Sequence, residues 1–362
     1  MGRNLIICCD GTANEFAKDR TNVLKLAYAA TKASDTQLLY YHPGVGTMAP
    51  PGAGLGLGRL FARLAGLGFG YGLQADIRDI YTFIIDHWQG GDSLYLFGFS
   101  RGAYTARAVA ALLNRYGLIG PGNAALVPYA IKLLWRWHAA KDPAAKSAWF
   151  ELAEEFKAAL SVSDCAIHFL GVWDTVSSVG WYSNPLSLPD TAALPNVKTV
   201  RHAVSIDERR AFFRTNLVRK PGNGDVKEVW FPGSHCDVGG GYSETTSGLS
   251  KIALEWMVAQ ATDAGMLFDN CRVATVLGRG DPGFVPPQPG AAMHNSLTPL
   301  WWPAEFLPKK HYDHATGQTS LRPNLFRRRH FDVAPCIHES AWDRGAAYLD
   351  QLPADARKVQ TG

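Results

Sequence analysis

The chain lacks the patterns that define several large classes of protein. Its six cysteines, at positions 8, 9, 165, 236, 271 and 336, include no C-x-x-C pair, so dithiol and zinc-ribbon motifs are excluded and we expect reduced cysteines that fill the core. No apolar run is long enough to span a bilayer, since the most lipophilic segment, 60–73, is short and rich in glycine. Neither a signal-peptide pattern nor an internal repeat is visible. We therefore expect a soluble protein made in the cytoplasm; export without a cleaved signal would leave no trace in the sequence.

An excess of charge of one sign is also missing. The 36 lysines and arginines are nearly matched by 32 aspartates and glutamates, which leaves a net charge of +4. The one dense basic cluster is RRRH at 327–330, and we interpret it as a solvated face. Proteins that bind nucleic acids usually concentrate their basic residues on one face or stripe. The sequence thus predicts no nucleic-acid partner.

Apolar residues are plentiful, and their order along the chain predicts the fold. They make up 47% of the 362 residues, which is ample for a large core. Short apolar runs predict strands at 5–9, 37–42, 94–99, 166–173, 198–206 and 228–231, and helical character is found at 21–31, 73–88, 103–116, 125–160 and 252–265. Alternation of strands and helices predicts an α/β fold with a mostly parallel sheet covered by helices on both faces.

We expect a single domain rather than two. Its core is predicted to span about residues 3–265, with cap elements near 50–73 and 117–160 and a proline- and aromatic-rich extension over 281–362. The Gly-rich segment 50–73 fits either a mobile apolar lid or a loop packed under the core, and the sequence leaves both interpretations open.

A polar residue follows each of several predicted strands. These residues are Asp10, Ser100, Asp174, Asp207 and His235. In parallel sheets, sites form at the carboxyl ends of the strands, where the residues that follow different strands meet. We therefore expect a functional site that draws on these five side chains.

Ser100 lies in the segment GFSRG, with glycine two positions before and two positions after it. A serine in G-x-S-x-G between a strand and a helix indicates a nucleophile elbow, a crowded turn that holds the hydroxyl at the edge of the sheet. The N-terminus of the following helix supplies a positive dipole end and unpaired amides. The alternative is a glycine-rich turn in which Ser100 only caps the helix.

A nucleophilic serine needs a base, and in this type of fold the chain order is serine, acid, histidine. His235, in EVWFPGSHCDVGGGY, follows a strand and precedes a glycine run that allows close backbone approach, so it is the favoured base. His338 is the second choice, whereas His168 and His202 lie within predicted strands and are expected to be packed in the core. 

The acid has two candidates. Counting strands back from the histidine favours Asp207, and Asp174, at the end of the preceding strand, is the alternative. The aspartate that is not the acid could contact substrate, water or a metal ion.

The oxyanion of an acyl-transfer reaction needs two backbone donors. Arg101, directly after the nucleophile, is expected to supply one amide, and Gly11 or Thr12 in CDGTAN the other. Asp10 is expected to accept hydrogen bonds that fix this loop, because a carboxylate cannot face an oxyanion.

Taken together, the segments IICCDGTAN, GFSRGAYTAR, GVWDTVSSVG, SIDERRAFF and VWFPGSHCDVGGGY resemble an α/β-hydrolase family. This family includes the catalytic domains of type VI secretion phospholipase effectors, and the resemblance covers about residues 3–265. It implies an α/β-hydrolase sheet, a Ser-Asp-His triad with Ser100 as nucleophile and His235 as base, and hydrolysis of glycerophospholipids.

The sequence thus predicts a serine hydrolase that cleaves an ester, favouring a lipid ester, through an acyl-enzyme. An apolar wall for the acyl chain could come from residues 55–71 together with Trp181 and Tyr182. The expected partners are an ester or lipid substrate and, for a lipid, the surface of a membrane; no cofactor and no metal are expected. A small-ester or thioester hydrolase and a non-catalytic hydrolase-like binding module are the alternatives.

Overall fold

A computed structural model describes most of the chain. The described residues are 2–11, 19–44, 69–176, 180–181, 184–185, 191–218, 224–312, 319–331 and 334–361. Among them, no helix combines the length and the hydropathy that a membrane span requires.

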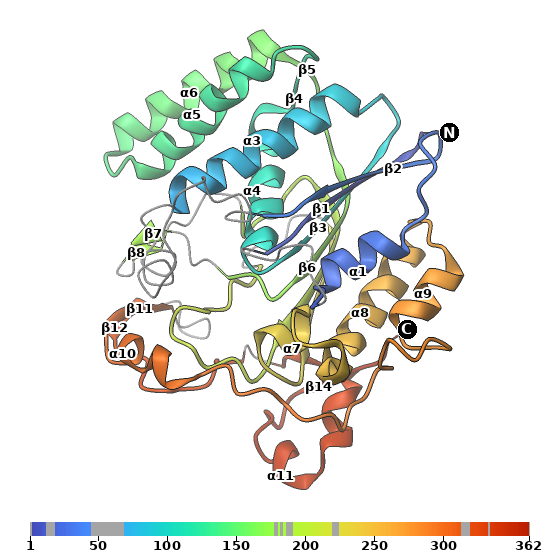
Figure 1. The fold of residues 1–362 in the computed structure, drawn as a ribbon. Helices are drawn as coiled ribbons and strands as arrows, with labels where there is room; N and C mark the ends of the chain where they lie inside the picture. Colours follow the sequence, from blue (N-terminus) through green and yellow to red (C-terminus); the bar gives the residue numbers. More distant parts are fainter. Residues whose placement is uncertain are drawn as a thin grey trace, which may run out of the picture.

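The centre of the fold is an eight-stranded sheet in which every neighbouring pair is parallel (Figure 1). In spatial order the strands are β14 (Arg357–Val359), β13 (Cys336–His338), β10 (Asp225–Phe231), β9 (Val197–Ser205), β6 (Ile167–Trp173), β3 (Ser93–Phe99), β1 (Asn4–Cys9) and β2 (Gln37–His42). The six predicted strands are confirmed, with ends shifted by a few residues at most. The chain runs from β1 outward to β2 and then returns to β3 on the other side of β1. This reversal makes the carboxyl ends of β1 and β3 a topological switch point, where open α/β sheets bind ligands in a crevice.

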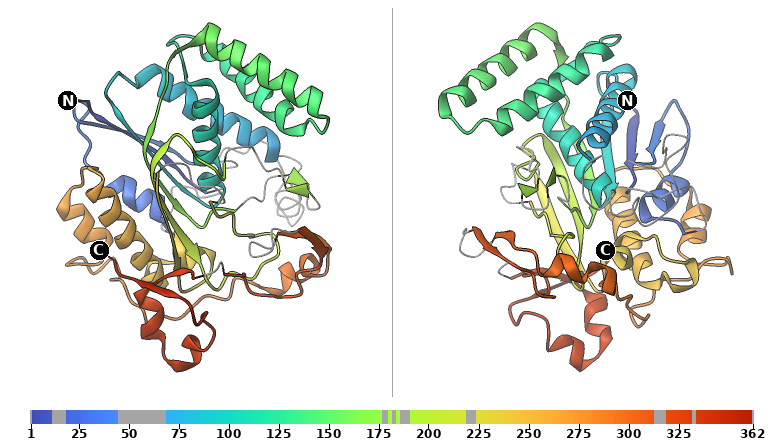
Figure 2. Two further views of the ribbon diagram at one scale, coloured as in Figure 1. Left: turned by 180° about the vertical axis from the view of Figure 1, so that it is seen from behind. Right: turned by 60° about the vertical axis from the view of Figure 1, so that its left-hand side comes forward.

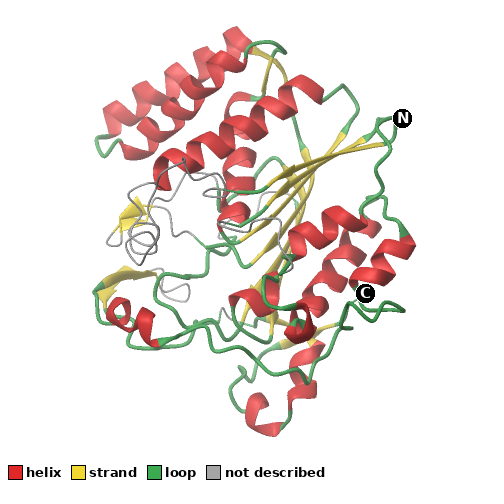
Figure 3. Cartoon of the chain, in the orientation of Figure 1, coloured by secondary structure: helices red, strands yellow, loops and turns green. Residues whose placement is uncertain are grey.

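Helices cover both faces of the sheet, as the sequence predicted (Figures 2 and 3). On one face lie α3 (Phe69–His87), α4 (Arg101–Tyr116), α5 (Val127–Ala139) and α6 (Pro143–Leu160). On the other lie α1 (Asn22–Ala29), α8 (Gly248–Asp263) and α9 (Asn270–Val276). The two-residue period of the strands explains this division: Leu5 and Ile7 point into the first layer, and Ile6 and Cys8 into the second.

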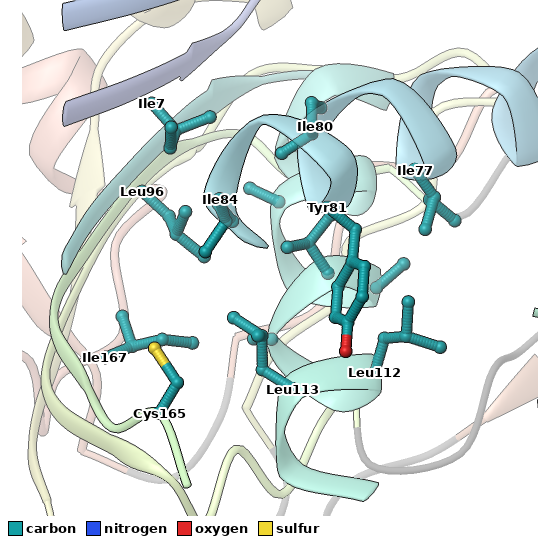
Figure 4. Close-up of a cluster of buried hydrophobic side chains, with 14 of the residues drawn as sticks. Ile7, Ile77, Ile80, Tyr81, Ile84, Leu96, Leu112, Leu113, Cys165 and Ile167 are labelled. Carbon is teal, nitrogen blue, oxygen red and sulfur yellow. The ribbon is translucent and has the colours of Figure 1, made fainter. Parts of the chain in front are cut away.

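The layer beneath α3 and α4 is filled by aliphatic side chains (Figure 4). Ile7 of β1 and Leu96 of β3 face Ile80 and Ile84 of α3, and all four are fully buried. Each such side chain contributes about 1.5–3 kcal/mol when it is removed from water. Leu112 and Leu113 of α4 belong to the same cluster, so this packing also holds α4 and the turn that precedes it.

The segment after residue 281 is more than an extension, because it adds two strands to the sheet. β13 pairs with β10, and β14 pairs with β13. Ile337 of β13 and Tyr348 of α11 (Ala346–Leu349) bury a third apolar cluster against Trp230 of β10. Strands of three residues are too short to show alternation, so no sequence pattern predicts them.

Candidate active site

Ser100 forms the turn between β3 and α4, at the crevice described above. Its φ of 59° and ψ of −118° place a non-glycine residue in a left-handed, sparsely populated region. Such a conformation costs about 1–3 kcal/mol and persists only where its surroundings enforce it. Here the Ser100 amide donates to the carbonyl of Trp173, at 3.0 Å, which ties the turn to the end of β6.

The two glycines that flank Ser100 allow three backbone segments to come together. A Cβ on Gly98 would lie 2.5 Å from the carbonyl oxygen of Gly102, and a Cβ on Gly102 would lie 2.2 Å from that of Cys9 in β1. Neither contact can be relieved by a side-chain rotation, because both partners are backbone atoms. The G-x-S-x-G spacing is therefore required by the close approach of α4 to β3 and β1.

His235 is the first residue of α7 (His235–Gly239), which begins just after β10. The helix is capped by Ser234 and Asp237, and Asp237 is itself held by His294, whose Nδ1 lies 2.6 Å from Oδ1. The buried imidazole packs 4.6 Å from the Phe99 ring, between centroids, and 4.8 Å from the Phe213 ring. Because Phe99 directly precedes Ser100, the histidine lies beside the serine turn.

The predicted role of the glycine run after the histidine is visible here. A Cβ on Gly239 would lie 1.9 Å from Cε2 of Phe99, and a Cβ on Gly240 would lie 2.8 Å from the amide nitrogen of Asn22. These glycines let α7 pack directly on the end of β3 and on α1.

The carboxylate that reaches His235 is Asp174, not the favoured Asp207. Oδ2 of Asp174 lies 2.5 Å from Nδ1 of His235, and Oδ1 accepts the amide of Ser205 at 2.9 Å. Asp174 ends β6 with a φ of 40°, and its side chain is almost completely buried.

Asp207 is engaged elsewhere. Its Oδ2 accepts the amide of Gly233 at 2.8 Å and the hydroxyl of Tyr348 at 2.7 Å, so it braces the turn that leads to His235. The strand count favoured Asp207, but it took no account of the direction in which each carboxylate leaves its strand, and the carboxylate in contact with His235 is Asp174.

Arg329 was interpreted from the sequence as part of a solvated basic face, and the structure corrects this. Its side chain is 7% exposed and makes a bidentate contact with Asp174, from Nη1 to Oδ1 at 2.5 Å and from Nη2 to Oδ2 at 3.0 Å. The same guanidinium donates to the carbonyls of Ser205 and Phe213. No local pattern distinguishes Arg329 from its exposed neighbours Arg327 and Arg328.

Glu208 is a second buried charge that the sequence analysis missed. Its Oε2 accepts the backbone amide of His235 at 3.2 Å, and its two oxygens bind Nε and Nη2 of Arg210 at 3.0 and 2.8 Å. Ser296 also donates to this carboxylate. Glu208 thereby links the start of α7 to the loop after β9.

The charges of the site are set by burial and by these pairs. Burial alone would raise the pKa of Asp174, but Arg329 and the hydrogen bond from His235 hold that pKa well below its ordinary value. Burial likewise opposes ionisation of Glu208, yet Arg210 lowers the pKa of Glu208 to about 2. Burial lowers the pKa of His235, and Asp174 only partly offsets this effect. The site therefore holds two carboxylates and a neutral imidazole at pH 7.

The loop after β1 differs in part from expectation. Asp10 accepts hydrogen bonds from the Gly11 amide, the Thr21 hydroxyl and the Tyr41 hydroxyl, each at 2.6 Å, and so fixes the loop as predicted. The Gly11 amide is thus directed at Asp10 in this structure and not toward Ser100. Thr12 lies outside the described residues. Arg101 is the first residue of α4, a helix of sixteen residues. The N-terminus of this helix therefore lies at the Ser100 turn.

The other candidate histidines have separate roles. His338 is buried in β13 between the hydroxyls of Ser340 and Thr361, and burial lowers its pKa to about 4. His202 is fully buried and pairs with Glu228, and His168 bonds the carbonyl of Ala264. The hydrogen bonds of these three histidines are thus made with groups other than Ser100. The proposed acyl wall cannot be placed: residues 55–68 and 182 lie outside the described residues, as do the side chains of 69–71 and 181.

The parallel sheet with helices on both faces has the architecture of an α/β-hydrolase fold. Comparison with known families agrees with this class. Residues 3–260 match the family described as "T6SS, Phospholipase effector Tle1-like, catalytic domain", and the chain belongs to this family.

Individual relatives are more distant. An uncharacterized protein of Saccharomyces cerevisiae, YEL023C, is 36% identical over 222 residues, which are 59% of this chain and 32% of that protein. The chain thus spans about a third of the length of this relative. Among solved structures, an uncharacterized protein from Pseudomonas aeruginosa is 21% identical, with a TM-score of 0.44 over 79% of this chain and 49% of that one. The Tle1 effector bound to the VgrG spike of the type 6 secretion system is 20% identical, with a TM-score of 0.37 over 68% and 52%.

Proposed function

We propose that this protein is a serine hydrolase that cleaves lipid esters, phospholipids included, through a covalent acyl-enzyme. Ser100 is the nucleophile, His235 the general base and Asp174 the acid that orients it. The observation that carries the proposal is the buried Asp174–His235 pair, 2.5 Å apart, packed through Phe99 against the strained Ser100 turn. Family membership supplies the class of substrate.

The reaction follows from this arrangement. Because Nδ1 of His235 bonds Asp174, Nε2 is the nitrogen left to take the proton from Oγ of Ser100 as the hydroxyl attacks the ester carbonyl. The C–O bond to the alcohol then breaks, and His235 returns the proton to the departing oxygen. Water hydrolyses the acyl-enzyme by the same proton path in reverse, which frees the carboxylic acid and restores Ser100.

Charge is stabilised at two places. The imidazolium that forms during attack is balanced by Asp174, whose low pKa keeps it ionised. The oxyanion develops near the N-terminus of α4, where the Arg101 amide and the helix dipole favour negative charge. The Gly11 amide donates to Asp10, so this proposal assigns only the Arg101 amide as a hydrogen-bond donor to the oxyanion.

Arg329 acts through Asp174 and is a positioning residue. Its two contacts fix the carboxylate in the plane that meets the imidazole, and its charge keeps the carboxylate deprotonated. It lies outside residues 3–260, so the segment beyond the family match completes the site.

The proposal is tested with a fluorophosphonate probe and a panel of esters. The wild-type chain should be labelled once, whereas Ser100→Ala should not be labelled and should lose on the order of 10⁴–10⁶ in kcat. Ser147→Ala, an exposed serine on α6, is the matched control and should behave as wild type. Long-chain esters and phospholipid vesicles should be cleaved.

Other outcomes discriminate between the alternatives. Labelling of Ser100 with turnover of acetate esters alone would replace the lipid ester by a small ester or thioester. A folded chain that is neither labelled nor active would refute the enzyme and favour a binding module.

A further inference from the structure

Exposed apolar side chains are concentrated in one segment of the chain. Half of the twelve large hydrophobic residues that are exposed in the described part of the structure lie between positions 300 and 325. They are 40–68% exposed and form what we call the 300–325 patch: Leu300, Trp302, Phe306, Leu307, Leu321 and Leu325. Contiguous apolar surface of this kind in a folded protein usually marks an interaction site.

The patch is built from two short helical turns and a hairpin. The turns are η3 (Pro299–Trp301) and α10 (Trp302–Glu305), and the hairpin pairs β11 (Lys309–Tyr312) with β12 (Thr319–Arg322). Both views in Figure 2 show this segment standing out from the body of the molecule. Trp302 and Phe306 flank Phe326, with their ring centroids 6.0 and 5.6 Å from the centroid of Phe326, so these three rings share one surface.

The patch has a fixed shape, because a buried carboxylate holds it from behind. Glu305 is fully buried and accepts the Ala211 amide at 2.6 Å, the Asn324 side-chain amide at 2.5 Å and the Phe326 amide at 3.1 Å. Leu325 and Phe326 have left-handed φ values of 50° and 60°, a strained pair that this network maintains. Leu325 remains 43% exposed although its backbone is strained. The strained conformation therefore does not bury the Leu325 side chain in the core.

In the described residues of this segment, the exposed charges have one sign. Among residues 291–312 and 319–331, the sole carboxylate is the buried Glu305, whereas Arg322 and Arg327 are exposed. Arg209 is also exposed and donates to the carbonyl of Phe326 at the rim. Apolar side chains bordered by arginines are complementary to a partner that has an apolar interior and anionic groups at its surface.

The patch continues into the candidate active site. Trp301, which directly precedes Trp302, packs edge-on against Phe213 with centroids 5.5 Å apart, and Phe213 packs 4.8 Å from His235. Two aromatic rings therefore separate the patch from the catalytic imidazole. Whatever covers the patch lies next to the site.

We propose that the 300–325 patch docks the protein on an anionic lipid bilayer, with Trp302 and Phe306 inserted at the headgroup level and Arg322 and Arg327 against the lipid phosphates. The choice of a bilayer rests on the proposed function, in which a lipid is the substrate. It also rests on the basic rim, since anionic lipids attract exposed arginines, and on the preference of Trp for membrane interfaces.

The test measures binding without hydrolysis. The full chain carrying Ser100→Ala is sedimented with vesicles of phosphatidylglycerol and phosphatidylcholine, or of phosphatidylcholine alone. Trp302→Ser/Phe306→Ser in this background should weaken binding at least tenfold, because two aromatic side chains are no longer buried. Arg322→Gln/Arg327→Gln should weaken binding to the anionic vesicles and reduce its dependence on salt.

A matched control is available on α5 and α6, which lie apart from the patch (Figure 1). Tyr129→Ser/Phe150→Ser removes two aromatic side chains, 46% and 43% exposed, from α5 and α6 and should leave vesicle binding unchanged. Thermal melts of all variants establish that they fold. Because Ser100→Ala removes the nucleophile, a failure of the proposed hydrolysis does not affect this result.

Three results would overturn the proposal. The first is absence of binding by the folded parent chain to anionic vesicles. The second is an equal loss in the two double-serine variants. The third is a parent chain that dimerises through the patch, detected by light scattering and abolished by Trp302→Ser/Phe306→Ser, which would make a second copy of this chain the occupant.

Discussion

Replacing Arg329 by glutamine should change the pH dependence of catalysis, not only its rate. Nη2 of Arg329 and Nδ1 of His235 both contact Oδ2 of Asp174, at 3.0 and 2.5 Å, so the two nitrogens lie no more than about 5.5 Å apart. At an effective dielectric constant of about 20, one unit charge at that distance is worth about 3 kcal/mol, or about two pKa units. Solvent that enters in place of the guanidinium reduces this figure, and we expect a shift of about one unit.

The direction follows from the charge that is lost. Arg329 lowers the pKa of Asp174. By Coulomb's law, a positive charge at that distance should also disfavour the imidazolium form of His235. In Arg329→Gln both pKa values rise. Because the proposed mechanism requires an ionised Asp174 and a neutral His235, the acid limb of the kcat/KM profile should move to higher pH by about one unit.

The assay is hydrolysis of a water-soluble p-nitrophenyl ester between pH 5 and 9, together with a thermal melt. Removal of one partner from a buried ion pair costs about 3–5 kcal/mol, so a lower Tm is expected in Arg329→Gln. Arg328→Gln is the control, since the neighbouring Arg328 side chain is 48% exposed and pairs with Asp207, not with Asp174. An acid limb in Arg329→Gln that coincides with that of wild type, at any activity, would refute the electrostatic role and leave Arg329 a structural residue.

Three further predictions follow from the same geometry. Asp174→Asn should lose about 10⁴ in kcat toward a soluble ester and, because it breaks the buried pair with Arg329, should also melt at a lower temperature; Asp207→Asn should lose far less activity, and the opposite ranking would transfer the acid role to Asp207. Gly102→Ala should destabilise the fold by a few kcal/mol in urea unfolding, because its Cβ meets backbone at 2.2 Å, whereas Gly290→Ala meets no atom within 4 Å and should be neutral, so equal costs would contradict this account. The pKa of Glu208 is lowered to about 2, so its ionised form contributes about 3 kcal/mol to the free energy of unfolding above a pH of about 4.5. This contribution is lost as the pH falls toward 2. Glu208→Gln should therefore flatten the acid part of the curve of stability against pH, which urea unfolding at a series of pH values would detect.

Local features of the sequence were sufficient for much of the fold. The strands at residues 4–9, 93–99 and 167–173 are continuous apolar runs because both of their faces are buried, and such runs are visible without a structure. The short strands β13 and β14 were missed, because three residues are too few to show a period, and their pairing depends on a sheet edge formed by distant residues.

Within the site, the sequence by itself determined Ser100 and His235 as candidates. Each is marked by glycines that are close in the chain, and those glycines are needed for backbone contacts that arise wherever a strand turns directly into a helix. Only the tertiary structure decided the rest. Asp174 and Asp207 follow adjacent strands in the same way, and what separates them is the direction of each side chain, with Asp174 turned toward the imidazole and Asp207 toward Gly233 and Tyr348. Arg329 joins Asp174 across 155 positions of the chain. A contact between residues so far apart in the sequence depends on the path of the whole chain, so no local sequence pattern around Arg329 predicts it.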